Sequence, residues 1–193
     1  MATDFDKAFA FTVSPAVEGG LADIKGDTGG RTIFGISERW FPEIERKIED
    51  MIKAGQNVAA MVAVKQFYHD EFWVKNSCDK LPYAVNCFMF DSSVNAGAYS
   101  TIDEIHKAIK IAINIYHNKD ISVDHVLSDA DYTYIHNIVE SGDDDLFTFL
   151  CCVARTDHYL DIANANENDR AVLRGWLNRS KNFRKAFLSP IFW

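Results

Sequence analysis

Two carboxylic acids and one hydroxyl lie close together in a glycine-rich stretch near the start of the chain. Asp27 follows Glu18 by nine residues, and Thr32 follows Asp27 by five. If the glycine-rich segment folds back as a hairpin, all three side chains can face one cleft. A protonated acid beside an ionised carboxylate is the arrangement that cleaves glycosidic bonds. The spacing therefore indicates glycoside hydrolysis as one chemistry that this stretch could perform.

The two carboxyl groups are expected to differ in pKa. Apolar residues recur with helical periodicity over 5–17, and Gly19 and Gly20 should end that helix after a bend at Pro15. Glu18 would then lie at a helix C-terminus among apolar neighbours, which raises its pKa and favours the protonated acid. Asp27, in a hydrated turn, would stay ionised and act on a water that Thr32 helps to position.

The spacing by itself is also compatible with ordinary turn chemistry. An acidic residue before glycines commonly ends a helix, and an aspartate in a glycine-rich turn is usually a turn residue. On base rates this simpler interpretation is favoured over catalysis. A calcium loop is disfavoured, because Asp23 and Asp27 are too few and too widely spaced for one.

The elements that must position this stretch are mostly helical. Glycines at 26, 29 and 30 predict a small β-hairpin over 21–34. Apolar residues at three- and four-residue spacing then predict a series of helices. Their expected ranges are 42–55, 57–68, 81–97, 102–116, 128–139, 146–163 and 167–186. The predicted fold class is mainly α, with a small β-hairpin region near the N-terminus and an α-helical C-terminal region.

Composition limits the possible partners. The 193 residues are 48% hydrophobic and carry a net charge of -8, which suits a folded protein and argues against nucleic acid. No long apolar segment and no signal peptide are visible, so we expect synthesis in the cytoplasm and no stable membrane insertion. The six histidines show no metal-binding spacing, and we expect neither a metal nor another cofactor.

The four cysteines are expected to be reduced and buried, since no CxxC spacing is present. A disulfide between Cys78 and Cys87 in an oxidising compartment stays open as an alternative.

The glycine-rich stretch resembles the N-terminal signature of glycoside hydrolase family 108, which comprises N-acetylmuramidases found mainly as bacteriophage endolysins. The matching positions are Glu18-Gly19-Gly20, Asp27, Gly29-Gly30, Thr32 and Gly35-Ile36-Ser37. Further along, Phe72-Trp73, the segment 90–97, Arg155, Tyr159 and the run 175–179 are similar to later features of the family. The resemblance covers essentially the whole chain.

The resemblance implies a lysozyme-like fold in which Glu18 is the catalytic acid. A similarity to the Glu/Asp/Thr triad of phage lysozymes further implies that Asp27 and Thr32 hold the attacking water and that the anomeric centre inverts. Residues 1–98 would form the muramidase catalytic region. Residues 99–193 would form a helical region that resembles a peptidoglycan-binding module, either packed with the first region as one body or separate from it. The implied reaction is hydrolysis of the β-1,4 bond between N-acetylmuramic acid and N-acetylglucosamine.

Six further residues are assigned to substrate binding: Gly30, Phe34, Asp91, Asn95, Arg155 and Tyr159. Gly30 and Phe34 belong to the glycine-rich stretch itself. Asp91 and Asn95 share one helix face, as do Arg155 and Tyr159, because each pair is four residues apart. Each pair could contact the glycan or could instead brace the structure around it.

The expected partners are peptidoglycan glycan strands and a holin-type release factor, with the protein acting as a monomer. It would reside in the host cytoplasm before lysis and act in the periplasm and cell wall after release. Two alternatives remain open. A lytic transglycosylase also needs one acidic glutamate, although it has no need of Asp27 or Thr32. A non-catalytic glycan-binding or virion structural protein on a lysozyme-like scaffold would not require Glu18.

Overall fold

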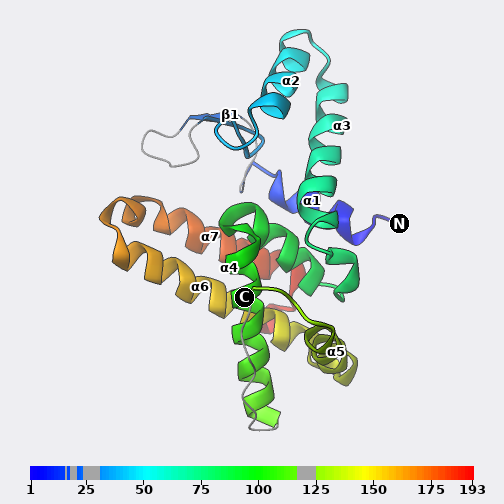
Figure 1. Ribbon diagram of the computed structural model, residues 1–193, viewed down its shortest axis with the longest axis vertical. Coiled ribbons are helices and arrows are strands. Elements are labelled where there is room, and N and C mark those ends of the chain that lie inside the picture. The colour runs from blue at the N-terminus through cyan, green and yellow to red at the C-terminus, as the bar shows by residue number, and fades with distance from the viewer. Residues whose placement is uncertain (16, 18–20, 24–30, 117–124) are drawn as a thin grey trace. The chain divides into compact units, whose positions relative to one another are not determined.

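The computed structural model describes residues 1–15, 17, 21–23, 31–116 and 125–193 (Figure 1). These residues form mainly helices, with one small antiparallel sheet near the N-terminus, so the predicted fold class is confirmed. The chain divides into two compact units, Met1–Lys75 and Asn76–Trp193. The predicted boundary after residue 98 separates a catalytic region from a second helical region by their functions, not by their packing. That division of functions stays a prediction.

In its described residues the first unit combines a short sheet with three α-helices and one π-helix. Its elements are α1 (Asp4–Thr12), β1 (Leu21–Asp23), β2 (Arg31–Ile33), β3 (Ile36–Ser37), α2 (Pro42–Lys53), α3 (Asn57–Tyr68) and the π-helical η1 (His69–Val74). The strands run antiparallel in the order β1-β2-β3. The hairpin predicted over 21–34 is therefore present as β1 and β2, and β3 extends it.

Helix α1 is shorter than its periodicity predicted. It begins at a capping box between Thr3 and Asp6 and ends at Thr12, with Val13 as its C-cap. The predicted extension to residue 17 is wrong. A proline disfavours helical geometry in the residue before it, and Ser14 precedes Pro15. The helix therefore stops before the proline, where the prediction had it bend.

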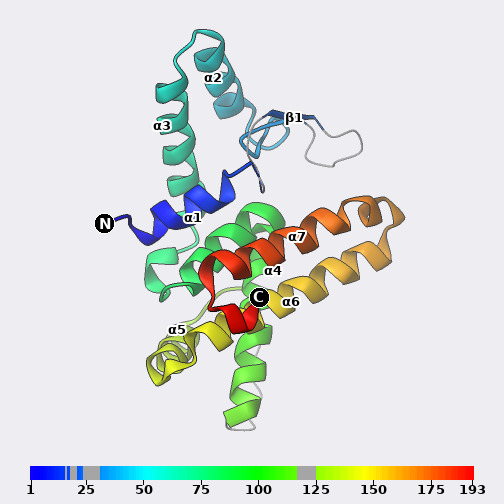
Figure 2. The same ribbon diagram turned by 180° about the vertical axis from the view of Figure 1, so that it is seen from behind.

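Helices α2 and α3 form an antiparallel hairpin (Figures 1 and 2). Pro42 occupies the first turn of α2, where its missing N–H costs nothing, and Gly55 allows the connection with a φ of 74°. Ile48 of α2 and Val64 of α3 are fully buried. Aromatic contacts attach α1 to this core, since the Phe9 ring lies 5.8 Å from Tyr68. The hairpin thus gives the sheet a rigid neighbour.

The second unit is entirely helical in the part of it that the structure describes. Its elements are η2 (Cys78–Lys80), α4 (Val85–Tyr116), α5 (Asp129–Ile138), η3 (Val139–Asp143), α6 (Asp144–Ala165), η4 (Glu167–Asp169), α7 (Arg170–Phe187) and η5 (Pro190–Phe192). Helix α6 packs along both α4 and α7, as Figures 1 and 2 show. The core between them includes Phe88 and Phe183, whose rings meet edge to face. Ser128 caps α5 as predicted.

Helix α4 changes direction at Gly97, where the sequence predicted one helix to end before the next began. Gly97 has a φ of 83° and a ψ of 159°, a backbone region that is open almost only to glycine. An added Cβ would meet no atom within 4 Å, so conformation alone demands glycine here.

We expect Gly97→Ala to lower the free energy of unfolding by about 1–3 kcal/mol, the cost of holding alanine in this region. Urea unfolding followed by circular dichroism would measure the loss. Gly175→Ala is the matched control, because Gly175 lies inside α7 and is equally unobstructed. That variant should be stabilised by about 0.5–1 kcal/mol. Equal effects of the two substitutions would contradict the conclusion that the backbone conformation at Gly97 requires glycine.

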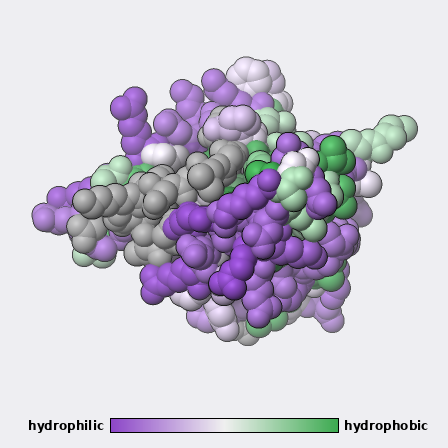
Figure 3. Space-filling model, turned by 90° about the horizontal axis from the view of Figure 1, so that it is seen from above, coloured by the Kyte–Doolittle hydropathy of each residue, from purple (hydrophilic) through white to green (hydrophobic). Residues whose placement is uncertain are grey.

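The cysteines lie inside the second unit, and one face of the protein is mostly hydrophilic. All four cysteines are free and buried, so the predicted reduced thiols are confirmed and the Cys78–Cys87 disulfide is not formed. Figure 3 shows a face on which hydrophilic side chains predominate and hydrophobic ones form only small patches. Among the helices of the described ranges, none is long and apolar enough to cross a membrane.

Candidate active site

Three of the predicted site residues, Glu18, Asp27 and Gly30, lie outside the described residues. Thr32 and Phe34 are the described site residues of the glycine-rich stretch. Helix α1 ends at Thr12, six residues before Glu18. The field of a helix end acts within about one turn. The predicted continuation of α1 up to Glu18 is therefore wrong, while the raised pKa of Glu18 itself stays a prediction.

Thr32 occupies the central strand of the sheet. It pairs with Ala22 of β1 on one side and with Ser37 of β3 on the other. Side chains alternate between the faces of a strand, so Thr32 lies on the face opposite Ile33, which is buried in the core. Thr32 itself is half-buried. The sheet therefore presents the Thr32 hydroxyl on the side away from the hydrophobic core. A catalytic hydroxyl would have to lie on that side.

Ion pairs fasten the central strand to helix α2. The Arg31 guanidinium donates to Glu45 at 2.6 Å and lies 2.9 Å from Glu49. Glu45 is almost fully buried, which strengthens its interaction with Arg31 relative to a surface pair. These contacts hold β2, and with it Thr32, in a defined position beside the hairpin.

The turn after β2 is held in an unusual conformation. Phe34 has a φ of 51° and Gly35 a φ of 79°. A positive φ is uncommon for a bulky residue and needs support from its surroundings. The buried hydroxyl of Tyr68 in α3 supplies it by donating to the Phe34 carbonyl at 2.7 Å. Phe34 is half-buried, and its contact with substrate stays a prediction.

The other four predicted binding residues come together inside the second unit. Arg155 of α6 donates to Asp91 of α4 at 2.7 Å, and Tyr159 of α6 donates to Asn95 of α4 at 2.6 Å. The four-residue spacing within each helix therefore places the two pairs opposite one another, as the shared faces predicted. Asp91 and Arg155 have no exposed surface, and Tyr159 has almost none.

Arg179 of α7 completes the network, and no pattern in the sequence predicted its pairing with Asp91. Its Nη2 donates to Asp91 Oδ1 at 2.9 Å and to the Asp91 carbonyl at 3.2 Å. Burial would raise the pKa of Asp91, but the Arg179 and Arg155 charges outweigh burial and lower the pKa. One carboxylate thus joins α4, α6 and α7. The network braces the helices, and direct contact of its members with a glycan stays a prediction.

Tyr159 is held as a neutral hydroxyl in this network. Burial raises its pKa to about 12, so it donates a hydrogen bond to Asn95 across the ordinary pH range. Its ring stacks on Trp176 of α7 with centroids 5.3 Å apart. The aromatic pair adds packing to the hydrogen-bonded link between α4 and α6.

A second buried carboxyl, Glu104, lies next to this network. Ser92 donates to Glu104 Oε2 at 2.6 Å, while Oε1 has no partner among the described residues. Burial raises the pKa of Glu104 to about 7, even though Ser92 and the Arg155 and Lys107 charges lower it. A carboxyl in the unfolded chain titrates near 4.5. Between these two values the folded protein retains a proton that the unfolded chain has lost.

Stability should therefore fall as pH rises from about 4.5 to 7, because the raised pKa stabilises the fold only while the carboxyl is protonated. The expected loss is about 3 kcal/mol, from about 1.4 kcal/mol per unit of pKa shift. Glu104→Gln should remove this pH dependence. The stability that the variant gains over the wild type should therefore be larger at pH 8 than at pH 5. Urea unfolding at both values would measure it, with exposed Glu140→Gln as control. A pH dependence unchanged in Glu104→Gln would contradict the prediction.

No group of three or more His, Cys, Asp or Glu residues in the described ranges is arranged to hold a metal ion. The described part of the candidate site is thus a strand-borne hydroxyl and a constrained turn, both in the first unit, whereas the buried ionic network belongs to the second unit by itself. The first two are consistent with a hydrolytic site whose acids lie in the flanking segment.

Comparison with known proteins found a matching family model and a similar solved structure. The model of the family described as Glycosyl hydrolase 108 matches residues 11–97. A solved structure, that of SagA from Brucella abortus, is similar with a TM-score of 0.63 and 20% sequence identity, over 94% of this chain and 91% of that chain. At this identity the likeness shows the fold. No curated protein sequence matches the chain.

Proposed function

We propose that this protein, whose residues 11–97 match the model of the glycosyl hydrolase 108 family, hydrolyses the β-1,4 bond between N-acetylmuramic acid and N-acetylglucosamine. The family match supports a lysozyme-like glycoside hydrolase that acts on peptidoglycan. The matched segment contains Glu18, Asp27 and Thr32, and that coincidence is the observation that carries the proposal. The muramidase specificity and an endolysin role go beyond the match and are part of the proposal.

In the proposed mechanism Glu18 is the general acid. It protonates the glycosidic oxygen as the bond to the anomeric carbon breaks, so that the departing sugar leaves as a neutral alcohol. Asp27 takes a proton from the attacking water and Thr32 orients that water by a hydrogen bond. An inverting reaction of this kind needs a carboxyl separation of roughly 6.5–9.5 Å, which leaves room for the water.

The proposal includes a place of action. As an endolysin the protein would wait in the host cytoplasm as a monomer and reach the cell wall when a holin-type partner permeabilises the membrane. The resemblance of the glycine-rich stretch to phage endolysins supports this part. Expression of the protein alone should leave cells intact, and co-expression with a holin should lyse them.

Mass analysis of the digestion products tests the bond that is cleaved. Purified peptidoglycan would be digested with the wild-type protein, reduced with borohydride and analysed for its new chain ends. Reduced N-acetylmuramic acid at those ends is the expected result. Reduced N-acetylglucosamine would identify a glucosaminidase, and 1,6-anhydro ends would identify a lytic transglycosylase. Absence of new ends would leave a non-catalytic glycan-binding protein.

A further inference from the structure

We propose that a groove along the α2–α3 hairpin binds sugar rings of the glycan strand and that Trp40 is its stacking platform. This inference rests on the proposed function, because it assigns a second binding region to the same polymer. It concerns residues of the first unit that the sequence patterns did not single out.

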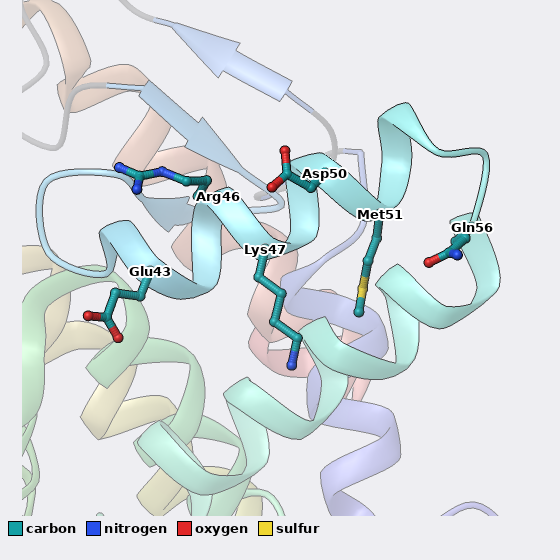
Figure 4. A pocket seen from close by; sticks show the side chains of 6 residues that line it. All are labelled: Glu43, Arg46, Lys47, Asp50, Met51 and Gln56. Carbon is teal, nitrogen blue, oxygen red and sulfur yellow. The ribbon is translucent and has the colours of Figure 1, made fainter.

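The groove consists of two cavities that share residues. One, of about 660 Å³, is lined by side chains that include Trp40, Phe41, Phe67, Gln66, Asp70 and Glu71. The other, of about 500 Å³, extends toward Met51 and Gln56 at the far end of the hairpin (Figure 4). Glu43 and Lys47 line both cavities. The shared residues make the two cavities neighbours along α2.

Trp40 provides an apolar surface that the fold itself does not use. Its side chain is 66% exposed at the entrance of the larger cavity. The Arg39 guanidinium lies over its ring, 5.1 Å from the centroid. Half-buried Phe41 and Phe67, whose rings are 4.8 Å apart, continue the aromatic surface inward. Aromatic faces of this kind bind the C–H faces of sugar rings with little loss of side-chain entropy.

The polar side chains of the groove carry both signs of charge. Four carboxylates and two cationic groups line the two cavities: Glu43, Asp50, Asp70 and Glu71, and Arg46 and Lys47. Glu71 is also paired with Lys75 at 2.6 Å. Gln66 donates to Asp70 at 2.9 Å, and this hydrogen bond together with one from His69 lowers the pKa of Asp70 and keeps it ionised. Hydroxyl and acetamido groups can donate to the carboxylates and accept from Lys47. An anionic polymer or stem peptide would meet mostly carboxylates, so a neutral glycan fits better.

The groove is connected directly to the sheet that carries Thr32. The Phe41 N–H donates to the Ser37 carbonyl at 2.9 Å, and Ser37 pairs with Thr32 across β3 and β2. Trp40 therefore follows the sheet within one turn of chain. Binding of sugar rings at a distance from the cleaved bond raises the affinity for long strands over short ones.

Calorimetric titration with glycan strands would test the proposal. The strands would first be freed of stem peptides by an amidase, and the lactyl carboxylates that this exposes would be capped as methylamides so that the glycan is neutral. Every protein would carry Glu18→Gln to prevent cleavage. Trp40→Ala should weaken binding about tenfold, as truncation of an aromatic anchor does. Trp40→Phe should keep most of the affinity. Val58→Ala is the control, since Val58 is also exposed and belongs to α3 but lines neither cavity, and it should bind like the parent.

Three outcomes would overturn the proposal: equal affinities of Trp40→Ala and the parent, no binding of the stripped strands by the parent, or binding of free stem peptides in their place. The result can be distinguished from failure of the proposed function, because the titration needs no catalysis. If the wild type cleaves peptidoglycan, Trp40→Ala in the active protein should raise KM for long strands and leave kcat unchanged. Exposed Trp40 makes little contribution to the core, so the variant should fold.

Discussion

Glu18→Gln should lower the rate of peptidoglycan hydrolysis by a factor of about 10² to 10⁴, the usual contribution of a general acid. Glutamine has nearly the size and shape of glutamate, so the variant tests the proton rather than the packing. Without that proton the leaving oxygen must depart as an alkoxide, which raises the barrier. Release of dye-labelled fragments from purified peptidoglycan, compared at equal protein concentration, would measure the two rates.

A matched variant separates the loss of the acid from a general effect of charge removal. Glu38 lies on the exposed turn after β3, and Glu38→Gln removes the same charge from the same region of the chain. It should retain the wild-type rate. The catalytic assignment would be overturned if Glu18→Gln kept more than half of the wild-type rate while its circular dichroism matched that of the parent.

Asp91→Ala should lower the free energy of unfolding by about 3–5 kcal/mol, the range observed when one partner of a buried ion pair is removed. Asp91 is fully buried and accepts hydrogen bonds from Arg155 and Arg179. Its removal leaves two guanidinium groups inside the second unit without their shared counter-charge. Urea unfolding followed by circular dichroism would measure the change.

The contrasting control is a surface pair in the same unit. Glu167 lies 3.6 Å from Arg170 with both side chains exposed, and such pairs contribute 0–1 kcal/mol. Glu167→Ala should therefore change stability by less than about 0.5 kcal/mol. A loss below about 1 kcal/mol in Asp91→Ala would show that the buried network does not hold the helices together.

Much of the fold could be predicted from local patterns. Apolar periodicity and turn residues located the helices, including the cap at Ser128 and the interruption at Gly97. The end of α1 was missed because apolar spacing continues past Thr12 even though Pro15 stops the backbone. The range predicted for α3, 57–68, matches the structure. Asn57 is helical, and Gln56 takes the N-cap position without a side-chain hydrogen bond.

The candidate site was likewise predictable only where local helical spacing determines which residues share a face. Helical spacing placed Asp91 with Asn95 and Arg155 with Tyr159, and the structure brings the two pairs together. Periodicity reports only which residues share a face of one helix, so it could not show that Arg179 reaches Asp91 from 88 residues away. Nor could it show the groove beside Trp40, because that depends on how two helices meet. Such contacts arise from packing between elements that are distant in sequence.

The most direct test of the central claim is the appearance of new reducing ends when the wild-type protein is incubated with purified peptidoglycan at several ionic strengths. Several salt concentrations are needed because a net charge of -8 makes adsorption to the wall sensitive to screening. We predict a steady increase in reducing ends under at least one of these conditions and none with Glu18→Gln. No increase with the wild type under any condition would contradict the assignment of this protein as a glycoside hydrolase.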